Sequence, residues 1–272
     1  MVAILERIVA ATRERVARTK READLRDLER KAEGHVPRGF RRALVAKSRE
    51  GVAVIAELKK ASPSKGMIRA VFRPAELARE LEEAGAAALS VLTDEEFFQG
   101  SLGNLREASA AVRVPCLRKD FIVDEFQLLE ARANSADAVL LIVAALSANE
   151  LGALAAGARQ RGLDVLCEAH DEEELQQARG AGCDLIGVNT RDLRTFKVDL
   201  ETAFRLAAKF PPGVVRVAES GIHSSEDVAR LRAAGYDAFL VGQSLMRAES
   251  PGEALQELMR VPTHEYRVPS GR

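Results

Sequence analysis

The chain has 272 residues, enough for one large domain or two of ordinary size. Hydrophobic residues make up 47% and charged residues 30%, which is typical of a globular protein and excludes disordered and fibrous classes. Lys and Arg total 40 against 41 for Asp and Glu, so the charge favours neither a nucleic-acid partner nor a polybasic membrane anchor. Aromatic residues are only 4% and Trp is absent, which also disfavours a base-stacking surface.

Three cysteines lie in apolar runs without forming a CxxC pair, which indicates buried thiols in a reducing compartment. They are Cys116, Cys167 and Cys183. Near the N-terminus, Glu6 and Arg7 interrupt the apolar core that a secretory signal needs. The longest uncharged stretch, 138–149, is shorter than the roughly 20 residues of a membrane helix. We therefore expect a cytoplasmic protein without a membrane-spanning segment.

Residues 1–50 are predicted to form a helical extension. Apolar residues recur at helical spacing in its first turns, and a dense run of mixed charge follows over 13–31. Gly and Pro residues then break the pattern before a short helical piece at 40–47.

From residue 52 onward, short apolar runs rich in β-formers alternate with amphipathic, charged segments. The eight strand candidates are 52–58, 86–92, 115–119, 137–143, 163–168, 183–189, 214–218 and 237–241. The helix candidates between them often open with Ser, Asp or Pro, residues common at helix starts. They include 74–84, 124–134, 147–161, 172–179, 224–234 and 251–259. The repeat is therefore a strand followed by a helix.

Nearly continuous apolar strands such as AVLLIV, at 138–143, indicate a parallel sheet covered by helices on both faces. Eight such units over roughly 200 residues favour a closed (β/α)8 TIM barrel of the α/β class. We assign the barrel to residues 51–260 and leave 261–272 as a C-terminal tail without a role. An open, doubly wound sheet is the alternative.

Polar residues end several of the apolar strands, and the active sites of such barrels form at these carboxyl ends. The residues are Glu57, Lys59, Lys119, Glu168, Asn189, Arg191, Glu219 and Ser220. A single one would indicate no more than a solvated charge. Five strands ending this way around one cavity, where an unpaired charge is costly, favour an active site.

Gly221 and Gly242 follow the seventh and eighth strands, where barrels commonly bind phosphate through backbone N–H groups. The four histidines show no metal-ligand spacing, and neither a P-loop nor a GxGxxG motif is present. The sequence therefore predicts acid–base chemistry by Lys and Glu on a phosphorylated small molecule, with no metal and no cofactor.

Seven segments between residues 55 and 247 carry a more specific signal, and the similarity that they support extends from the N-terminal helix to about Leu258. They are IAELKKASPSKG (55–66), SVLTDEEFFQGS (90–101), LRKDFIVDEFQ (117–127), ADAVLLIV (136–143), GVNTRDLRTFKVDL (187–200), AESGI (218–222) and FLVGQSLMR (239–247). Together they resemble the indole-3-glycerol phosphate synthases, barrel enzymes of tryptophan biosynthesis. The resemblance implies closure of 1-(2-carboxyphenylamino)-1-deoxyribulose 5-phosphate to indole-3-glycerol phosphate, with loss of CO₂ and water and without a cofactor.

The resemblance also implies roles for the residues at the strand ends. Lys119 matches the general acid of the ring-closing condensation. Glu168 matches the carboxylate that stabilises the cationic intermediate and serves in the later dehydration. Lys59 matches a second lysine that binds substrate and acts in dehydration, with Glu57 polarising the lysine pair. Three further residues match polar groups that orient the substrate, namely Asn189, Glu219 and Ser220.

The substrate contacts that the resemblance implies fall into three groups. Arg191 suits the anthranilate carboxylate, because a guanidinium pairs with a planar carboxylate through two hydrogen bonds. The apolar wall for the anthranilate ring comprises Phe98, Phe121, Leu140, Leu193 and Phe196. The phosphate contacts are Ser62, Gly221, Gly242 and Gln243. The SPSKG loop at 62–66 is expected to be a mobile lid, and the N-terminal extension is expected to cover the barrel mouth.

Two positions depart from the family pattern. Thr190 stands where many relatives have Asn, and Gln243 stands where many have Ser or Glu. The second departure puts a side-chain phosphate contact in doubt but leaves the backbone N–H group.

Three other functions remain open on the sequence. The first is a phosphoribosylanthranilate isomerase-like barrel, which needs a Cys or Asp acid–base pair at strands one and six. The second is an aldolase that forms a Schiff base on Lys119 or Lys59, and the third is a non-catalytic phosphate-binding barrel. We expect a monomer that has no nucleic-acid or membrane partner and associates at most weakly with other enzymes of the tryptophan pathway.

Overall fold

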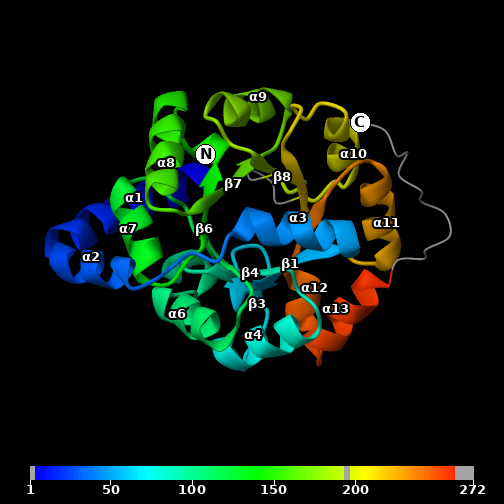
Figure 1. Cartoon of the computed structure of the whole chain (residues 1–272), viewed down its shortest axis with the longest axis horizontal. Coiled ribbons are helices and arrows are strands. Elements are labelled where there is room, and N and C mark those ends of the chain that lie inside the picture. The colour runs from blue at the N-terminus through cyan, green and yellow to red at the C-terminus, as the bar shows by residue number, and fades with distance from the viewer. Residues whose placement is uncertain (1–3, 193–196, 261–272) are drawn as a thin grey trace.

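A computed structural model of the chain describes residues 4–192 and 197–260 (Figure 1). Its eight parallel strands close into a barrel in which successive strands are neighbours and the last pairs with the first. These strands are β1 (Ala53–Leu58), β4 (Ala88–Leu92), β5 (Cys116–Lys119), β6 (Ala138–Ile142), β7 (Asp164–Ala169), β8 (Leu185–Asn189), β9 (Val215–Glu219) and β10 (Ala238–Val241). The predicted TIM barrel is confirmed, and the doubly wound alternative is wrong.

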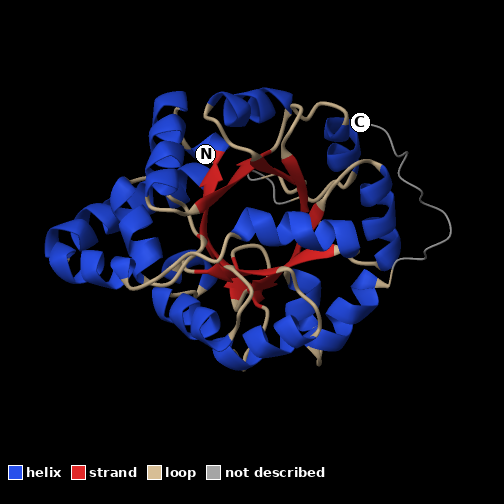
Figure 2. Ribbon diagram, viewed as in Figure 1, coloured by secondary structure: helices blue, strands red, loops and turns tan. Residues whose placement is uncertain are grey.

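Helices surround the barrel (Figure 2). They are α4 (Pro74–Glu83), α5 (Glu95–Phe98), α6 (Leu102–Ala111), α7 (Glu125–Ala133), α8 (Ala148–Gln160), α9 (Glu172–Gly180), α10 (Glu201–Ala207), α11 (Ser225–Ala233), α12 (Gln243–Arg247) and α13 (Pro251–Met259), with a 3₁₀ turn η1 (Val143–Ala145) after β6. None of the helices in the described part of the chain is long and apolar enough to cross a membrane.

The polar residues before several helices cap them as their sequence positions indicate. Asp124, Ser147 and Ser224 each accept a hydrogen bond from a backbone N–H group in the first turn of α7, α8 and α11, forming capping boxes. Pro74 and Pro251 occupy the first turns of α4 and α13, where a missing N–H group costs nothing. These caps set where the loops at the carboxyl ends of the strands finish.

Alternation along the strands separates the two faces of the barrel wall. Ile55, Leu117 and Leu166 point into the barrel and belong to one apolar cluster, whereas their neighbours pack outward against the helices. Two residues further along these strands come Glu57, Lys119 and Glu168. The inward face is therefore apolar in the middle of the barrel and charged at its carboxyl end.

The N-terminal segment contacts both ends of the barrel. Its helices are α1 (Ile4–Glu22), α2 (Leu25–Glu33) and α3 (Phe40–Glu50). Helix α1 lines the cavity at the carboxyl ends of the strands through Ile4, Leu5 and Ile8. Helix α3 lies across the opposite end (Figure 2), where Phe40 and Leu44 are completely buried against the first residues of the strands.

A short hairpin follows β1 at the mouth of the barrel. Strand β2 (Ala61–Ser62) pairs antiparallel with β3 (Gly66–Met67), and residues 62–65 between them line the cavity. This hairpin contains the segment that the sequence predicts to be a lid; its motion stays a prediction.

Candidate active site

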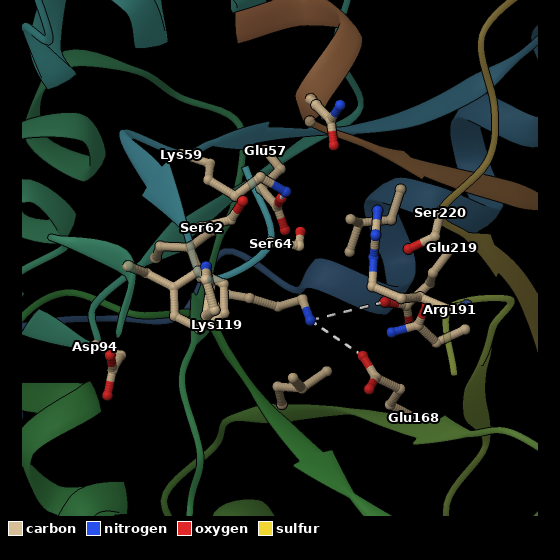
Figure 3. A pocket seen from close by; sticks show the side chains of 18 of the residues that line it. Glu57, Lys59, Ser62, Ser64, Asp94, Lys119, Glu168, Arg191, Glu219 and Ser220 are labelled. Carbon is tan, nitrogen blue, oxygen red and sulfur yellow. Dashed lines mark hydrogen bonds and ion pairs between the residues drawn. The ribbon is translucent and has the colours of Figure 1, made fainter. Parts of the chain in front are cut away.

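A cavity of about 410 Å³ opens at the carboxyl ends of the strands (Figure 3). Every sequence-predicted site residue that the structure describes lines this cavity. They are Glu57, Lys59, Ser62, Phe98, Phe121, Lys119, Leu140, Glu168, Asn189, Arg191, Glu219, Ser220, Gly221, Gly242 and Gln243. The other two predicted residues, Leu193 and Phe196, lie outside the described residues.

Lys119, the last residue of β5, extends across the cavity toward two carboxylates (Figure 3). Its Nζ lies 3.1 Å from Glu168 Oε2 and 3.9 Å from Glu219 Oε2. Burial disfavours the ammonium form, but the charges of Glu168, Glu219 and Glu57 outweigh it and raise the pKa of Lys119. Lys119 is therefore protonated at neutral pH.

Glu168 and Glu219 titrate in opposite directions. Burial opposes ionisation of Glu168, yet the nearby Lys119 and His170 prevail and lower its pKa to about 2. Burial and the charge of Glu168 together raise the pKa of Glu219 well above its usual range. Two carboxyl groups with pKa values pushed apart by their surroundings can serve as an anion and a proton donor in one site.

Gly187 makes room for this pair. It is an inward-facing residue of β8, registered beside Glu168 of β7 and Val217 of β9. A Cβ at this position would lie 2.0 Å from Glu219 Oε1. Only glycine therefore lets the Glu219 side chain cross the face of β8.

We expect Gly187→Ala to displace the Glu219 carboxyl group. Overpacking of this kind lowers the free energy of unfolding by about 1–3 kcal/mol, and the folded enzyme should also lose turnover. Thermal denaturation and kcat measure the two effects. Gly152→Ala is the matched control, because its Cβ would meet nothing within 4 Å and it lies in α8. Wild-type stability and kcat in Gly187→Ala would contradict the assignment.

Glu57 and Lys59 lie on the same side of the chain, as strand alternation predicts, and their side chains form a hydrogen-bonded ion pair. Gly242 at the end of β10 allows this arrangement, because a Cβ there would lie 2.5 Å from Glu57 Oε1. The glycine that the sequence suggests for phosphate binding thus has a packing reason as well.

Arg191 and Asn189 extend the polar part of the wall from β8. The Asn189 side-chain oxygen accepts a hydrogen bond from the backbone N–H of Arg191 at 3.0 Å. Thr190 between them donates to the carbonyl oxygen of Ser220 at 3.0 Å, which ties the loops after β8 and β9 together. Sequence reasoning noted Thr190 only as a departure and missed this contact.

Several other lining residues were missed. Asp94 and Asp120 follow β4 and β5, and both lie within ion-pair distance of Arg15 on α1, at 3.6 and 3.5 Å. Strand alternation could have indicated Asp94, which comes two residues after the inward-facing Leu92. Nothing in the sequence indicates that a helix far away along the chain supplies its partner.

Fold and site together define a TIM-barrel enzyme of the acid–base type. The described residues contain no group of three or more His, Cys, Asp and Glu side chains placed to hold a metal ion. What the cavity brings together is a protonated lysine, an ionised carboxylate, a carboxyl group of raised pKa and a second lysine–glutamate pair.

Comparison with known sequences places the chain in a family. A sequence profile described as indole-3-glycerol phosphate synthase matches residues 5–258. An indole-3-glycerol phosphate synthase of Koribacter versatilis is 60% identical over 95% of this chain and 100% of its own. One from Burkholderia ambifaria is 51% identical over 94% of this chain and 98% of its own. The chain belongs to the indole-3-glycerol phosphate synthase family, which confirms the resemblance seen in the sequence.

Solved structures with low sequence identity share the fold. A thiamine phosphate pyrophosphorylase from Pyrococcus furiosus covers 79% of this chain and 96% of its own with a TM-score of 0.59 at 18% identity. A mandelate oxidase mutant covers 86% and 91% with a TM-score of 0.57, also at 18% identity. At this identity the likeness concerns the barrel alone.

Proposed function

We propose that the protein closes 1-(2-carboxyphenylamino)-1-deoxyribulose 5-phosphate to indole-3-glycerol phosphate, releasing CO₂ and water, in tryptophan biosynthesis. The observation that carries this proposal is the protonated Lys119 between Glu168 and Glu219 at the mouth of the barrel. The family relationship supports the same reaction.

In the condensation step, the substrate carbonyl needs a proton while the aromatic ring attacks it. Lys119 is the proton donor, because it is cationic and extends into the cavity. The attack leaves positive charge on the substrate nitrogen. Glu168 remains ionised and stabilises that charge across the cavity until CO₂ departs.

The later dehydration removes a hydroxyl group as water. Lys59, held by Glu57, binds substrate and protonates the leaving hydroxyl, while Glu168 accepts the ring proton. Asn189, Glu219 and Ser220 orient the substrate. The raised pKa of Glu219 lets its carboxyl group donate a hydrogen bond.

The two anionic ends of the substrate have separate partners in the cavity. For the phosphate, Ser62 offers a buried hydroxyl that has no hydrogen-bond partner among the described residues. Backbone N–H groups complete the phosphate site at Gly221, Gly242 and Gln243. Arg191 binds the anthranilate carboxylate, and the ring lies against Leu140 and the adjacent pair Phe98 and Phe121, whose ring centroids are 6.3 Å apart.

One assay tests the function. Incubation with the carboxyphenylamino ribulose phosphate, without added metal or cofactor, should release CO₂ and develop indole fluorescence. Borohydride added during turnover should leave no covalent adduct, because the protonated Lys119 is not a nucleophile. A stable adduct on Lys119 or Lys59 would instead support the Schiff-base aldolase, and absence of turnover would support the non-catalytic barrel.

The isomerase-like alternative finds little support in the site. It needs a Cys or Asp acid–base pair at strands one and six, and the corresponding strands β1 and β8 carry Glu57 and Asn189 near their carboxyl ends. Conversion of phosphoribosylanthranilate by the purified protein would favour this alternative.

The proposal includes a cytoplasmic location and a monomer that associates at most weakly with other enzymes of the pathway. The three cysteines support a reducing compartment, because all are free and buried. Size-exclusion chromatography with light scattering measures the oligomeric state.

A further inference from the structure

His170 is a mostly buried histidine that the mechanism above does not use, with 17% of its side chain exposed. It follows directly after β7, two residues beyond Glu168, so it points to the same side of the strand. It is absent from the lining of the cavity, and its Nε2 has no hydrogen-bond partner among the described residues. That atom lies 3.6 Å from Glu168 Oε1, within ion-pair range.

The two oxygens of Glu168 therefore face two different basic side chains. Oε2 lies 3.1 Å from Lys119 Nζ, on the substrate side, and Oε1 faces the imidazole of His170 behind it. A positive group beside each oxygen restrains the plane of the carboxylate when the substrate arrives. Lys119 is then able to release a proton without leaving Glu168 unpaired.

Glu174 on α9 holds the imidazole in place. Its Oε2 lies 3.0 Å from His170 Nδ1 and also accepts a hydrogen bond from the His170 backbone N–H at 2.8 Å. Because Nδ1 carries a proton toward Glu174, a neutral ring would direct the lone pair of Nε2 at the Glu168 carboxylate, and the two would repel each other. In a protonated ring, Nε2 carries a proton instead and attracts the carboxylate.

The surroundings of the imidazole favour its charged form. Burial and Lys119 oppose the charge, whereas Glu174 on α9 and Glu168 on β7 favour it, and the balance raises the pKa of His170. The same contact contributes to the lowered pKa of Glu168. Positive His170 and negative Glu168 thus stabilise each other.

We propose that His170 is a positioning residue of the reaction: its imidazolium, held by Glu174, fixes the Glu168 carboxylate from behind and keeps it ionised for the cationic intermediate. The inference rests on the proposed function. It predicts that turnover declines once His170 loses its proton. This loss should occur at a pH above about 6.5, the ordinary pKa of histidine.

His170→Asn is the first test. The Asn amide can replace Nδ1 toward Glu174 but presents no cation to Glu168. We expect kcat to fall about 10-fold with KM nearly unchanged, because the change affects a group that acts in the transition state. The basic limb of the pH profile that belongs to His170 should also disappear. Unchanged kcat together with an unchanged basic limb would overturn the proposal.

Glu174→Gln keeps the test decisive if the Asn variant fails to fold. The substituted amide retains an oxygen acceptor for Nδ1 but removes one of the two negative charges beside the ring. The basic limb of kcat should move about one pH unit lower, a shift that a purely structural contact would not cause. Glu173→Gln is the matched control on the same turn of α9, since Glu173 is exposed and its side chain accepts a hydrogen bond from Gln177.

A titration of the imidazole ¹⁵N shifts separates this inference from the proposed function. In the wild-type protein His170 should remain doubly protonated above about pH 6.5, and Glu168→Gln should lower its pKa. If the wild type turns over no substrate, the proposed function fails, and the titration still decides whether His170 and Glu168 are coupled. A pKa of His170 that does not respond to Glu168→Gln overturns the inference.

Discussion

Replacing Lys119 by Ala is expected to lower kcat by well over the roughly 10²-fold typical of a lost general acid. Lys119 is the cation that lies between two buried carboxyl groups, with its Nζ 3.1 Å from Glu168 Oε2. Single-turnover kinetics, followed by indole fluorescence, measures the chemical step directly. Full activity in Lys119→Ala would refute the assignment.

Two further variants show whether such a loss comes from the missing proton donor or from the missing charge. Lys119→Arg keeps a positive charge near Glu168 and Glu219, but a guanidinium does not give up its proton. We expect it to bind substrate and still lose turnover, which separates proton donation from charge balance. Lys209→Ala is the matched control, because Lys209 is exposed and pairs at the surface with Glu172.

Replacing Glu168 by Gln is expected to reduce kcat by about 10²–10³-fold. The amide keeps the size of the side chain but removes the negative charge that faces the cationic intermediate. It also removes the largest of the favourable charges that raise the pKa of Lys119. Circular dichroism and thermal denaturation check that the variant folds, so that a loss of activity reports on the missing charge.

The same variant should change Glu219. Its pKa is raised first by burial and then by the charge of Glu168, so neutralising Glu168 lowers it. Glu172→Gln, an exposed carboxylate on α9, serves as the control for the loss of one negative charge. A Glu168→Gln enzyme with kcat within about threefold of wild type would contradict the charge-balance role.

Most of the barrel could be predicted from the sequence because buried parallel strands have an unmistakable apolar pattern. Each of the eight predicted runs contains or overlaps an observed strand, with ends that differ by at most two residues. The barrel helices missing from the prediction are α5, α6, α10 and α12, with four, ten, seven and five residues. The three shorter ones contain too few residues for their periodicity to be recognised.

The members of the site were predictable, but their pairing was not. Alternation along each strand indicates that Lys119, Glu168 and Glu219 face inward. Which carboxyl group binds the lysine depends on the stagger of strands around the closed barrel and on the space at Gly187. Histidine was considered only as a metal ligand, although the spacing that paired Glu57 with Lys59 also relates Glu168 to His170.

The position of α3 has a consequence for the order in which parts of the protein fold. Phe40 and Leu44 pack in one cluster with Leu185, Val215 and Ala238, which belong to the last three strands. The backbone N–H of Arg41 also binds the Asp164 carboxylate at 2.9 Å, at the start of β7. Helix α3 is therefore fully packed only when the last three strands have joined the barrel, so closure of the barrel and burial of α3 are coupled.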